Sequence, residues 1–269
     1  MFIDLLIAIF FFLVGLEIKH GLKDFKSAIV PIVAAMGGMI FPALIYISLN
    51  PGSHVWATAM PTDIALALGV LSLLGKRVQP QVRLFLLTLA IADDLFSLVV
   101  LGIFYGNDLH PEKALSTLGA AALGVALPLG KSQLNKAIKV LSPVSTYFIV
   151  PVIVAVNFPL DINLDSFTSA TTVALVIARS VGKIVGITLF AWLAIQLKFA
   201  IKPASLNFKE IAGAGALAGM GLTVSLFIAD LALTSAQDLA QVKVGLIVAA
   251  LISALLGLAI LRKYSVKSD

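Results

Sequence analysis

Long apolar stretches, separated by short polar loops, run along the whole chain. Most of them reach the roughly 20 residues that an α-helix needs to cross a bilayer. This pattern predicts an all-α, polytopic membrane protein that forms a single membrane domain over residues 1–269. We expect nine membrane segments, at residues 1–18, 28–49, 57–75, 83–105, 114–129, 143–158, 168–196, 210–231 and 240–262.

Basic residues gather in alternate loops of this predicted topology. They follow the first, third, fifth, seventh and ninth segments, whereas the other loops hold mainly acids. The positive-inside rule assigns the basic loops to the cytoplasm, so we expect the N-terminus outside and the C-terminus in the cytoplasm. The first segment lacks a basic leading region and a small-residue cleavage site, which favours a retained helix over a signal peptide.

The composition agrees with a protein that has little mass outside the bilayer. Of 269 residues, 60% are hydrophobic and 12% are charged, and the mean hydropathy is +1.06. There is no cysteine, and the three histidines have no metal-ligand spacing. A phosphate-binding glycine loop is also missing from the sequence, so ATP-driven transport is not expected. No cofactor is predicted. The basic loops explain the net charge of +5 without a nucleic-acid partner.

Two adjacent acids, Asp93 and Asp94, lie near the middle of the fourth segment. A charge at that depth costs about 2.5–3.5 kcal/mol on insertion scales, so a bound cation, a proton or a buried base has to compensate it. The pair therefore indicates an ion or proton pathway. The alternative is a pair that is neutralised by protonation or by a structural partner.

Asp63 follows Pro61 and Thr62 inside the third segment. Pro61 removes a backbone donor and disrupts the helix. Freed backbone groups at membrane depth are tolerated where they line a cavity or are buried in protein. Thr62 and Asp63 are therefore candidate ion-binding residues. Alternatively, Asp63 caps the half-helix that follows it.

The seventh segment carries two bases, Arg179 and Lys183, on one helical face because they are four residues apart. A lysine near a helix end often snorkels to the interface, but apolar turns flank Lys183 on both sides, so we expect a buried partner. Arg179 could pair with an aspartate, reach a polar cavity or snorkel. If it faces the aspartates, it would oppose cation binding.

The eighth segment is dense in glycine, with Gly213, Gly215, Gly219 and Gly221 before two hydroxyl residues. Such glycines allow close helix packing, and they also suit an interrupted helix. Residues 28–105 and 168–262 would then form two triplets, each with its interrupted helix in the middle. An odd number of segments separates their starts, so the triplets run in opposite directions, as in secondary transporters with inverted repeats.

Six stretches with distinctive residues follow one another along the chain. They are Gly-Leu-Glu-Ile-Lys at 15–19, Gly-Gly-Met-Ile-Phe-Pro-Ala-Leu at 37–44, Thr-Asp-Ile-Ala-Leu-Ala-Leu-Gly-Val-Leu at 62–71, Leu-Ala-Ile-Ala-Asp-Asp-Leu at 89–95, Gly-Lys-Ile-Val-Gly-Ile at 182–187 and Gly-Met-Gly-Leu-Thr-Val-Ser-Leu-Phe-Ile-Ala at 219–229. Together they resemble the bacterial NhaA sodium/proton antiporters. The resemblance implies a transporter of the bacterial inner membrane, not an enzyme, with inverted repeats and two interrupted helices that cross.

The resemblance also implies roles at the paired acids. Asp94 would be the main sodium- and proton-binding carboxylate, and sodium would be held at Asp94 and Asp93. Asp93 would pair with Lys183 when it is deprotonated.

Further roles follow at the crossing and at the cytoplasmic side. Thr62 and Asp63 would lie where the interrupted helices cross, and Asp63 and Lys183 would offset the positive and negative half-helix ends. Glu17 and His20 would lie at a cytoplasmic mouth that is linked to pH control.

The chain also departs from the family pattern. Members typically have twelve helices, and we expect the first helix with its extracellular hairpin, and a helix pair between Asp108 and Ala114, to be absent. Any homodimer would have to form without that hairpin. Arg179 stands where an apolar residue is expected, and Ile138 and Lys139 stand near the place of an acidic pH-sensing residue.

The resemblance implies an electrogenic sodium (or lithium)/proton antiporter of a lipid bilayer that serves sodium and pH homeostasis. One alternative is a transport-inactive, reduced homologue with a structural role; the absent helices favour it and the intact set of site residues opposes it. Another is an organic-anion transporter that binds a carboxylate with Arg179 and Lys183. Three nearby aspartates argue against an anion site.

Overall fold

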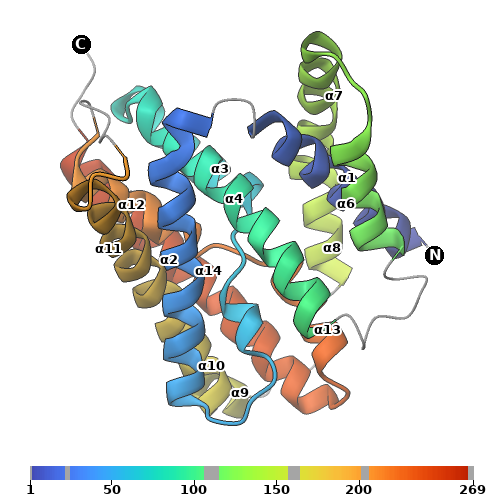
Figure 1. Cartoon of the computed structure of the whole chain (residues 1–269). Helices are drawn as coiled ribbons and strands as arrows, with labels where there is room; N and C mark the ends of the chain where they lie inside the picture. Colours follow the sequence, from blue (N-terminus) through green and yellow to red (C-terminus); the bar gives the residue numbers. More distant parts are fainter. Residues whose placement is uncertain (1, 22–24, 106–114, 157–163, 201–205, 266–269) are drawn as a thin grey trace.

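The structure, a computed structural model, describes residues 2–21, 25–105, 115–156, 164–200 and 206–265. Within these ranges the chain is helical, without strands (Figure 1), which confirms the predicted all-α membrane class. Five continuous helices are long and apolar enough to cross a membrane, or six if one bent pair is a single span. The count of nine segments stays a prediction, and the helix pair expected to be absent between Asp108 and Ala114 falls outside the described residues.

The longest elements of the fold are four uninterrupted helices and two that are each built from several consecutive helical segments. The single helices are α1 (Phe2–Gly21), α2 (Phe25–Leu49), α4 (Pro80–Phe104) and α14 (Ala236–Tyr264). The first compound helix consists of α7 (Lys131–Val144), a π-helical turn Ser145–Ile149 and α8 (Val150–Val156). The second consists of α9 (Asp165–Thr168), α10 (Ala170–Ile177), a π-helical turn Ala178–Gly182 and α11 (Lys183–Gln196).

Shorter elements complete the fold. They are a 3₁₀ turn Trp56–Ala59, α3 (Ile64–Ser72), a 3₁₀ turn Gly75–Arg77, a π-helical turn Leu115–Gly119, α6 (Ala120–Ala126), α12 (Phe208–Ala218) and α13 (Thr223–Ala232).

The predicted start of the sixth segment at residue 143 is wrong. The helix already begins at Lys131 and continues to Val156. The prediction treated the polar stretch before residue 143, which includes Lys136 and Lys139, as a loop. Lysine is a good helix former, so loss of apolar character ends the membrane part of a helix but not the helix itself.

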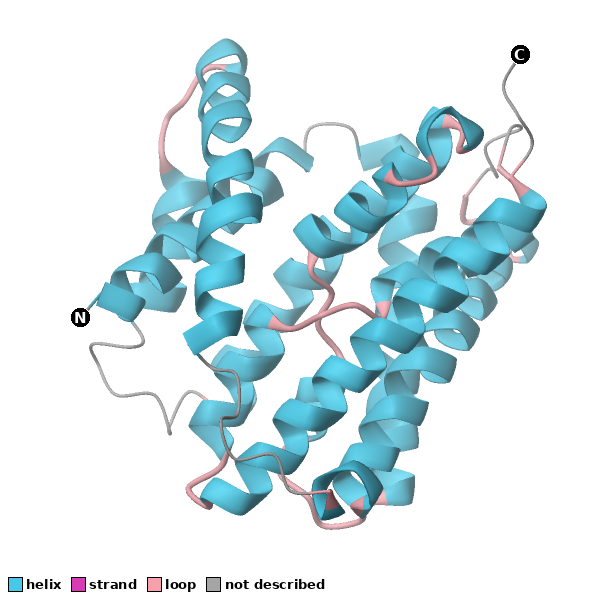
Figure 2. Cartoon of the chain, turned by 180° about the vertical axis from the view of Figure 1, so that it is seen from behind, coloured by secondary structure: helices cyan, strands magenta, loops and turns pink. Residues whose placement is uncertain are grey.

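Two helices are broken, as the proline and glycine residues of the third and eighth segments predict. Residues 60–63 separate the turn Trp56–Ala59 from α3, and residues 219–222 separate α12 from α13, whose axes differ by 47°. Figure 2 shows the two breaks crossing near the middle of the molecule. The backbone N–H of Asp63 donates to the carbonyl of Met220 at 3.0 Å, which joins the two breaks directly.

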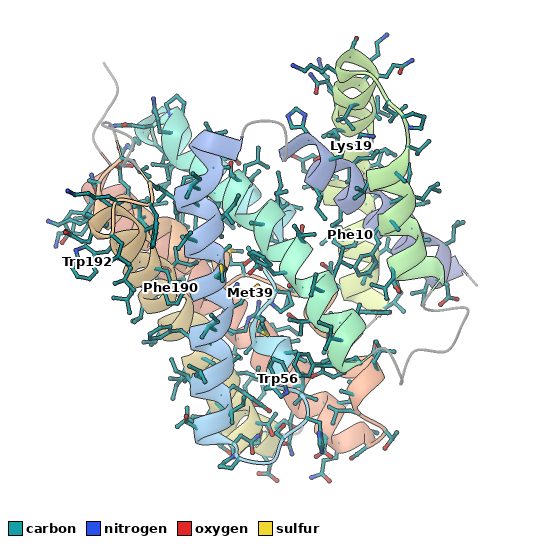
Figure 3. The ribbon with its side chains drawn as sticks, in the orientation of Figure 1. Phe10, Lys19, Met39, Trp56, Phe190 and Trp192 are labelled. Atoms are coloured by element: carbon teal, nitrogen blue, oxygen red, sulfur yellow. The ribbon has the colours of Figure 1, made fainter. Side chains whose placement is uncertain are left out.

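Close backbone contacts fix the helices around this crossing. α2 packs along α11, and α1 packs along α6. A Cβ atom at Gly37 or at Gly186 would collide with the carbonyl of the other residue, so α2 and α11 approach as closely as only glycine allows. On the opposite side of α11 the indole of Trp192 points outward (Figure 3), where it is half-exposed. The crossing thus lies inside a helical shell whose outer surface is apolar.

Candidate functional site

The ion pair of Asp93 and Lys183 lies at the centre of the site. Lys183 Nζ is 3.3 Å from Asp93 Oδ1, and both side chains are 0% exposed. The same ammonium donates to Thr62 Oγ1 at 2.8 Å. The pairing that the resemblance implied is therefore present, and Lys183 has the buried partner expected of it rather than snorkelling to the interface.

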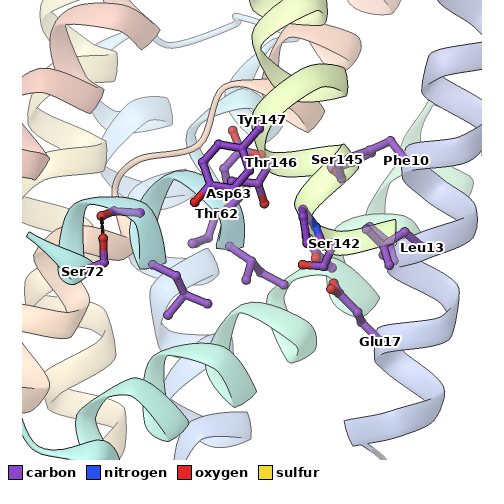
Figure 4. Close-up of a pocket in the computed structure, with 17 residues that line it drawn as sticks. Phe10, Leu13, Glu17, Thr62, Asp63, Ser72, Ser142, Ser145, Thr146 and Tyr147 are labelled. Carbon is purple, nitrogen blue, oxygen red and sulfur yellow. Dashed lines mark hydrogen bonds between the residues drawn. The ribbon is translucent and has the colours of Figure 1, made fainter. Parts of the chain in front are cut away.

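Asp94 lies next to this pair but faces a cavity. The cavity has a volume of about 270 Å³, and its lining includes Asp94. Thr62, Asp63 and Glu17, labelled in Figure 4, also line it. Asp94 itself is 6% exposed. Adjacent acids on one helix therefore have different surroundings: the first is enclosed with a base, and the second borders space in which an ion or water can sit.

Asp63 binds the start of the other broken helix. Its Oδ2 accepts the backbone N–H groups of Leu222, at 2.5 Å, and Thr223, at 3.0 Å, and its Oδ1 accepts the Thr223 hydroxyl. It forms no side-chain cap on α3, the helix that follows it. The alternative in which Asp63 caps its own half-helix is thus wrong. Its carboxylate instead faces the positive N-terminal end of α13.

Arg179 binds the carbonyl ends on the other side of the crossing. It donates to the carbonyl oxygens of Thr58, Pro61 (2.8 Å) and Gly219 (3.1 Å) and to the hydroxyl of Ser225 (3.0 Å). The side chain is 0% exposed, so it neither snorkels nor forms an ion pair with an aspartate among the described residues. The residue was visible in the sequence, but its partners were not, because they lie 40 to 121 positions away.

The base that binds the carbonyl ends of the interrupted helices is therefore not the one that the resemblance implied. Lys183, which was expected to offset the negative half-helix ends, contacts Asp93 and Thr62. Its ammonium is linked to α12 through the hydroxyl of Thr62, which donates to the carbonyl of Ala218 at 2.8 Å. Arg179 takes the direct contacts instead.

Comparison with known proteins decides the relationship that the motifs suggest. The sequence profile of the family described as Na+/H+ antiporter 1 matches residues 1–133 and 115–261. The chain is 35% identical over 317 aligned residues to the Na(+)/H(+) antiporter NhaA 2 of Aliarcobacter butzleri (strain RM4018), which covers 94% of this chain and 80% of that protein. The chain belongs to the NhaA sodium/proton antiporter family.

Other NhaA proteins match to a similar extent. The Na(+)/H(+) antiporters NhaA of Escherichia coli O139:H28 (strain E24377A / ETEC) and of Citrobacter koseri (strain ATCC BAA-895 / CDC 4225-83 / SGSC4696) are each 34% identical, over 96% of this chain and 82% of their own length. The alignment with the first extends over 321 positions, more than the 269 residues of the chain. It therefore contains gaps in this chain.

Glu17 and His20, the two residues expected at a cytoplasmic mouth, differ in their position relative to the cavity. Glu17 lines the cavity together with Asp94. His20 is exposed near the end of α1 and is not part of the cavity lining. Its neighbour Lys19, labelled in Figure 3, donates to the carbonyl of Leu127 at the end of α6. Geometry therefore connects Glu17, but not His20, to the site.

The sequence reasoning missed one wall of this NhaA cavity. Ser142, Ser145 and Thr146 line it from the end of α7 and the π-helical turn that follows (Figure 4). A cluster of hydroxyl residues within an otherwise apolar stretch was the available signal. Their position opposite Glu17 and Asp94 becomes visible only once α1 and α7 pack side by side.

Proposed function

We propose that the chain exchanges sodium (or lithium) ions for protons across a bacterial inner membrane, and that Asp94 carries the exchanged ion. One observation carries the proposal: Asp94 borders a cavity beside the closed Asp93–Lys183 pair, at the crossing of two broken helices. A carboxylate in this position accepts either a sodium ion or a proton, but not both.

The charges of the site support exchange with more protons than sodium ions. In the proton-loaded state, Asp94 is neutral and Asp93 pairs with charged Lys183. Sodium then displaces the proton of Asp94 and draws Asp93 away, and Lys183 releases a second proton because it has lost its partner. Two protons leave for one sodium ion, so one net charge moves per cycle. The membrane potential contributes about 2.3 kcal/mol per 100 mV for that charge.

The proposal extends to the architecture. Residues 28–105 and 168–262 each hold a long helix, a broken helix and a second long helix, in that order. We regard them as inverted repeats in which α2, α3 and α4 correspond to α10 with α11, α12 with α13, and α14. The basic loops favour an external N-terminus and a cytoplasmic C-terminus.

The alternative functions are less favoured by the contacts at the site. An organic anion would need free donors, yet Arg179 donates to three carbonyls and one hydroxyl. Lys183 is likewise engaged by Asp93 and Thr62. A transport-inactive homologue has no need of an acid that borders a cavity beside a buried ion pair.

Proton flux in everted membrane vesicles tests the proposal. Respiration acidifies the vesicle interior, and addition of sodium or lithium should release protons in vesicles that contain the chain. Potassium and choline salts at equal ionic strength serve as controls, as do vesicles without the chain. Equal responses to all four cations would reject sodium/proton exchange and favour the inactive homologue.

A further inference from the structure

We infer that Arg179 is a positioning residue for ion exchange: it fixes and neutralises the carbonyl ends of both broken helices, which leaves Lys183 free to part from Asp93 when sodium binds. The inference rests on the proposed function. It assigns to Arg179 a task that the family resemblance gave to Lys183.

The contacts of Arg179 join both breaks through one rigid group. Two of its acceptors belong to the first broken helix, the carbonyl of Thr58 in the turn before the break and that of Pro61 in the break itself, and the carbonyl of Gly219 belongs to the second break. The hydroxyl of Ser225 adds a contact within α13. A planar guanidinium holds several donors at fixed angles, so these four acceptors cannot move apart without losing hydrogen bonds.

The charge of Arg179 matches what the crossing requires. The C-terminal end of an α-helix carries about −0.5 of an elementary charge, and at Arg179 the end of α12 meets the carbonyl of Thr58 in the turn Trp56–Ala59. On the opposite side, Asp63 faces the start of α13. The crossing is therefore neutralised by Arg179 and Asp63, and the Asp93–Lys183 pair is neutral by itself. Asp94 borders the cavity instead of a base, which suits the binding of a monovalent cation.

The local backbone is shaped around the guanidinium. Arg179 lies in the π-helical turn Ala178–Gly182, and such turns often mark functional positions in helices. A Cβ atom at Gly221 would collide with the carbonyl of Pro61 and with the Arg179 guanidinium. Space for Arg179 is thus built into the second break by a residue without a side chain.

Lys183 lies one helical turn further along and is not held in the same way. Its ammonium contacts two side chains, Asp93 and Thr62, both of which can rotate. Arg179 contacts mainly backbone, which cannot. The contacts therefore distinguish a cation bound mainly to backbone from one bound to side chains, and we assign only the second to the exchange step.

Three variants of the full chain separate these roles. Arg179→Gln removes the charge, Arg179→Lys keeps the charge but not the planar fork, and Lys183→Gln is the matched control one turn away. Thermal unfolding is measured in detergent by fluorescence-detected size exclusion. Sodium-dependent proton flux is measured in proteoliposomes and normalised to folded protein.

We expect Arg179→Gln to lower Tm by at least about 5 °C more than Lys183→Gln does, because it leaves several buried carbonyls without donors. Arg179→Lys should recover most of Tm, since it keeps the charge. Its maximal exchange rate per folded molecule should nevertheless stay at least about tenfold below wild type, because the two breaks are no longer held in register. A residue with a purely structural role would recover rate and Tm together.

Three results would overturn the inference. They are an equal or larger loss of Tm in Lys183→Gln, full recovery of the exchange rate in Arg179→Lys, and wild-type exchange in Arg179→Gln. If wild type itself shows no sodium-dependent flux, the proposed function fails, and the order of the Tm values still decides whether Arg179 holds the crossing together.

Discussion

The ammonium of Lys183 lies 3.3 Å from the carboxylate of Asp93, and neither side chain has any exposed surface. An ion pair of this kind, enclosed at the crossing of two broken helices, loses both hydration shells. Its formation is supported by a third group, the hydroxyl of Thr62 at 2.8 Å from the ammonium. Buried pairs contribute little net stability, but removal of one partner is strongly destabilising. Such a pair suits a device that changes partners during a cycle.

The first prediction concerns Asp94. Asp94→Asn keeps the size of the side chain but removes the charge that would bind sodium, so sodium-dependent proton release should fall to background. Tm should change by no more than about 3 °C, because Asp94 borders a cavity rather than an ion pair. Proton flux in everted vesicles gives the rate, and membrane yield gives the folded amount. Normal exchange in this variant would remove Asp94 from the mechanism.

The second prediction concerns the pairing of Asp93 with Lys183. Asp93→Asn and Lys183→Ala should each destabilise the protein by about 3–5 kcal/mol, because each leaves one buried charge without its partner. The double variant should be less destabilised than the sum of the two, by about 1–3 kcal/mol. A double-mutant cycle in detergent measures this coupling. Additive effects would show that the pair does not contribute as a unit.

The third prediction concerns the cap that Asp63 forms on α13. Asp63→Ala removes the acceptor of two backbone N–H groups and of one hydroxyl, and should cost about 2–4 kcal/mol. Thr223→Val is the graded comparison, because it removes the hydroxyl contact alone and should cost about 1 kcal/mol. Chemical unfolding ranks the two variants. If Thr223→Val is the more harmful, Asp63 does not hold α13.

The fourth prediction concerns the close approach at Gly221. Gly221→Ala introduces a methyl group against the carbonyl of Pro61 and the guanidinium of Arg179, so it should lower both Tm and the exchange rate. The overpacking should cost about 1–3 kcal/mol. Gly102→Ala is the control, since among the described residues a methyl group there meets only Leu118, at 3.9 Å. Similar Tm values for the two variants would argue against a tight crossing.

The fifth prediction concerns Glu17 in the wall of the cavity. Glu17→Gln removes an acid from the lining, so at alkaline pH, where that acid is ionised, the sodium concentration for half-maximal exchange should rise about two- to fivefold. The maximal rate should stay unchanged, because Glu17 does not contact the Asp93–Lys183 pair. Asp238→Asn, an exposed acid outside this lining, should leave both values as in wild type. A lower maximal rate in Glu17→Gln with an unchanged sodium requirement would contradict a role in attracting the ion.

The sequence by itself determined the features that depend on local chemistry. Apolar length predicts helices, and the helices are present. Pro61 removes a donor and the glycines near residue 219 weaken the helix, so both breaks could be located. The depth of Asp93, Asp94 and Lys183 in apolar segments marks them as functional candidates, because an unexplained charge in the membrane is costly. None of these inferences requires knowledge of a distant residue.

Only the tertiary structure decided which distant groups meet. Asp63 had two interpretations in the sequence, an ion-binding residue or a cap on the helix that follows it, yet its carboxylate binds Thr223, which is 160 positions away. Arg179 had several possible partners in the sequence, and its acceptors are backbone carbonyls, which every residue has and no side-chain pattern marks. The hydroxyl wall around Ser145 became part of the cavity only through the packing of α7 against α1. Hydrogen bonds between backbone ends depend on how helices cross, and that geometry is set by the whole fold rather than by any one segment.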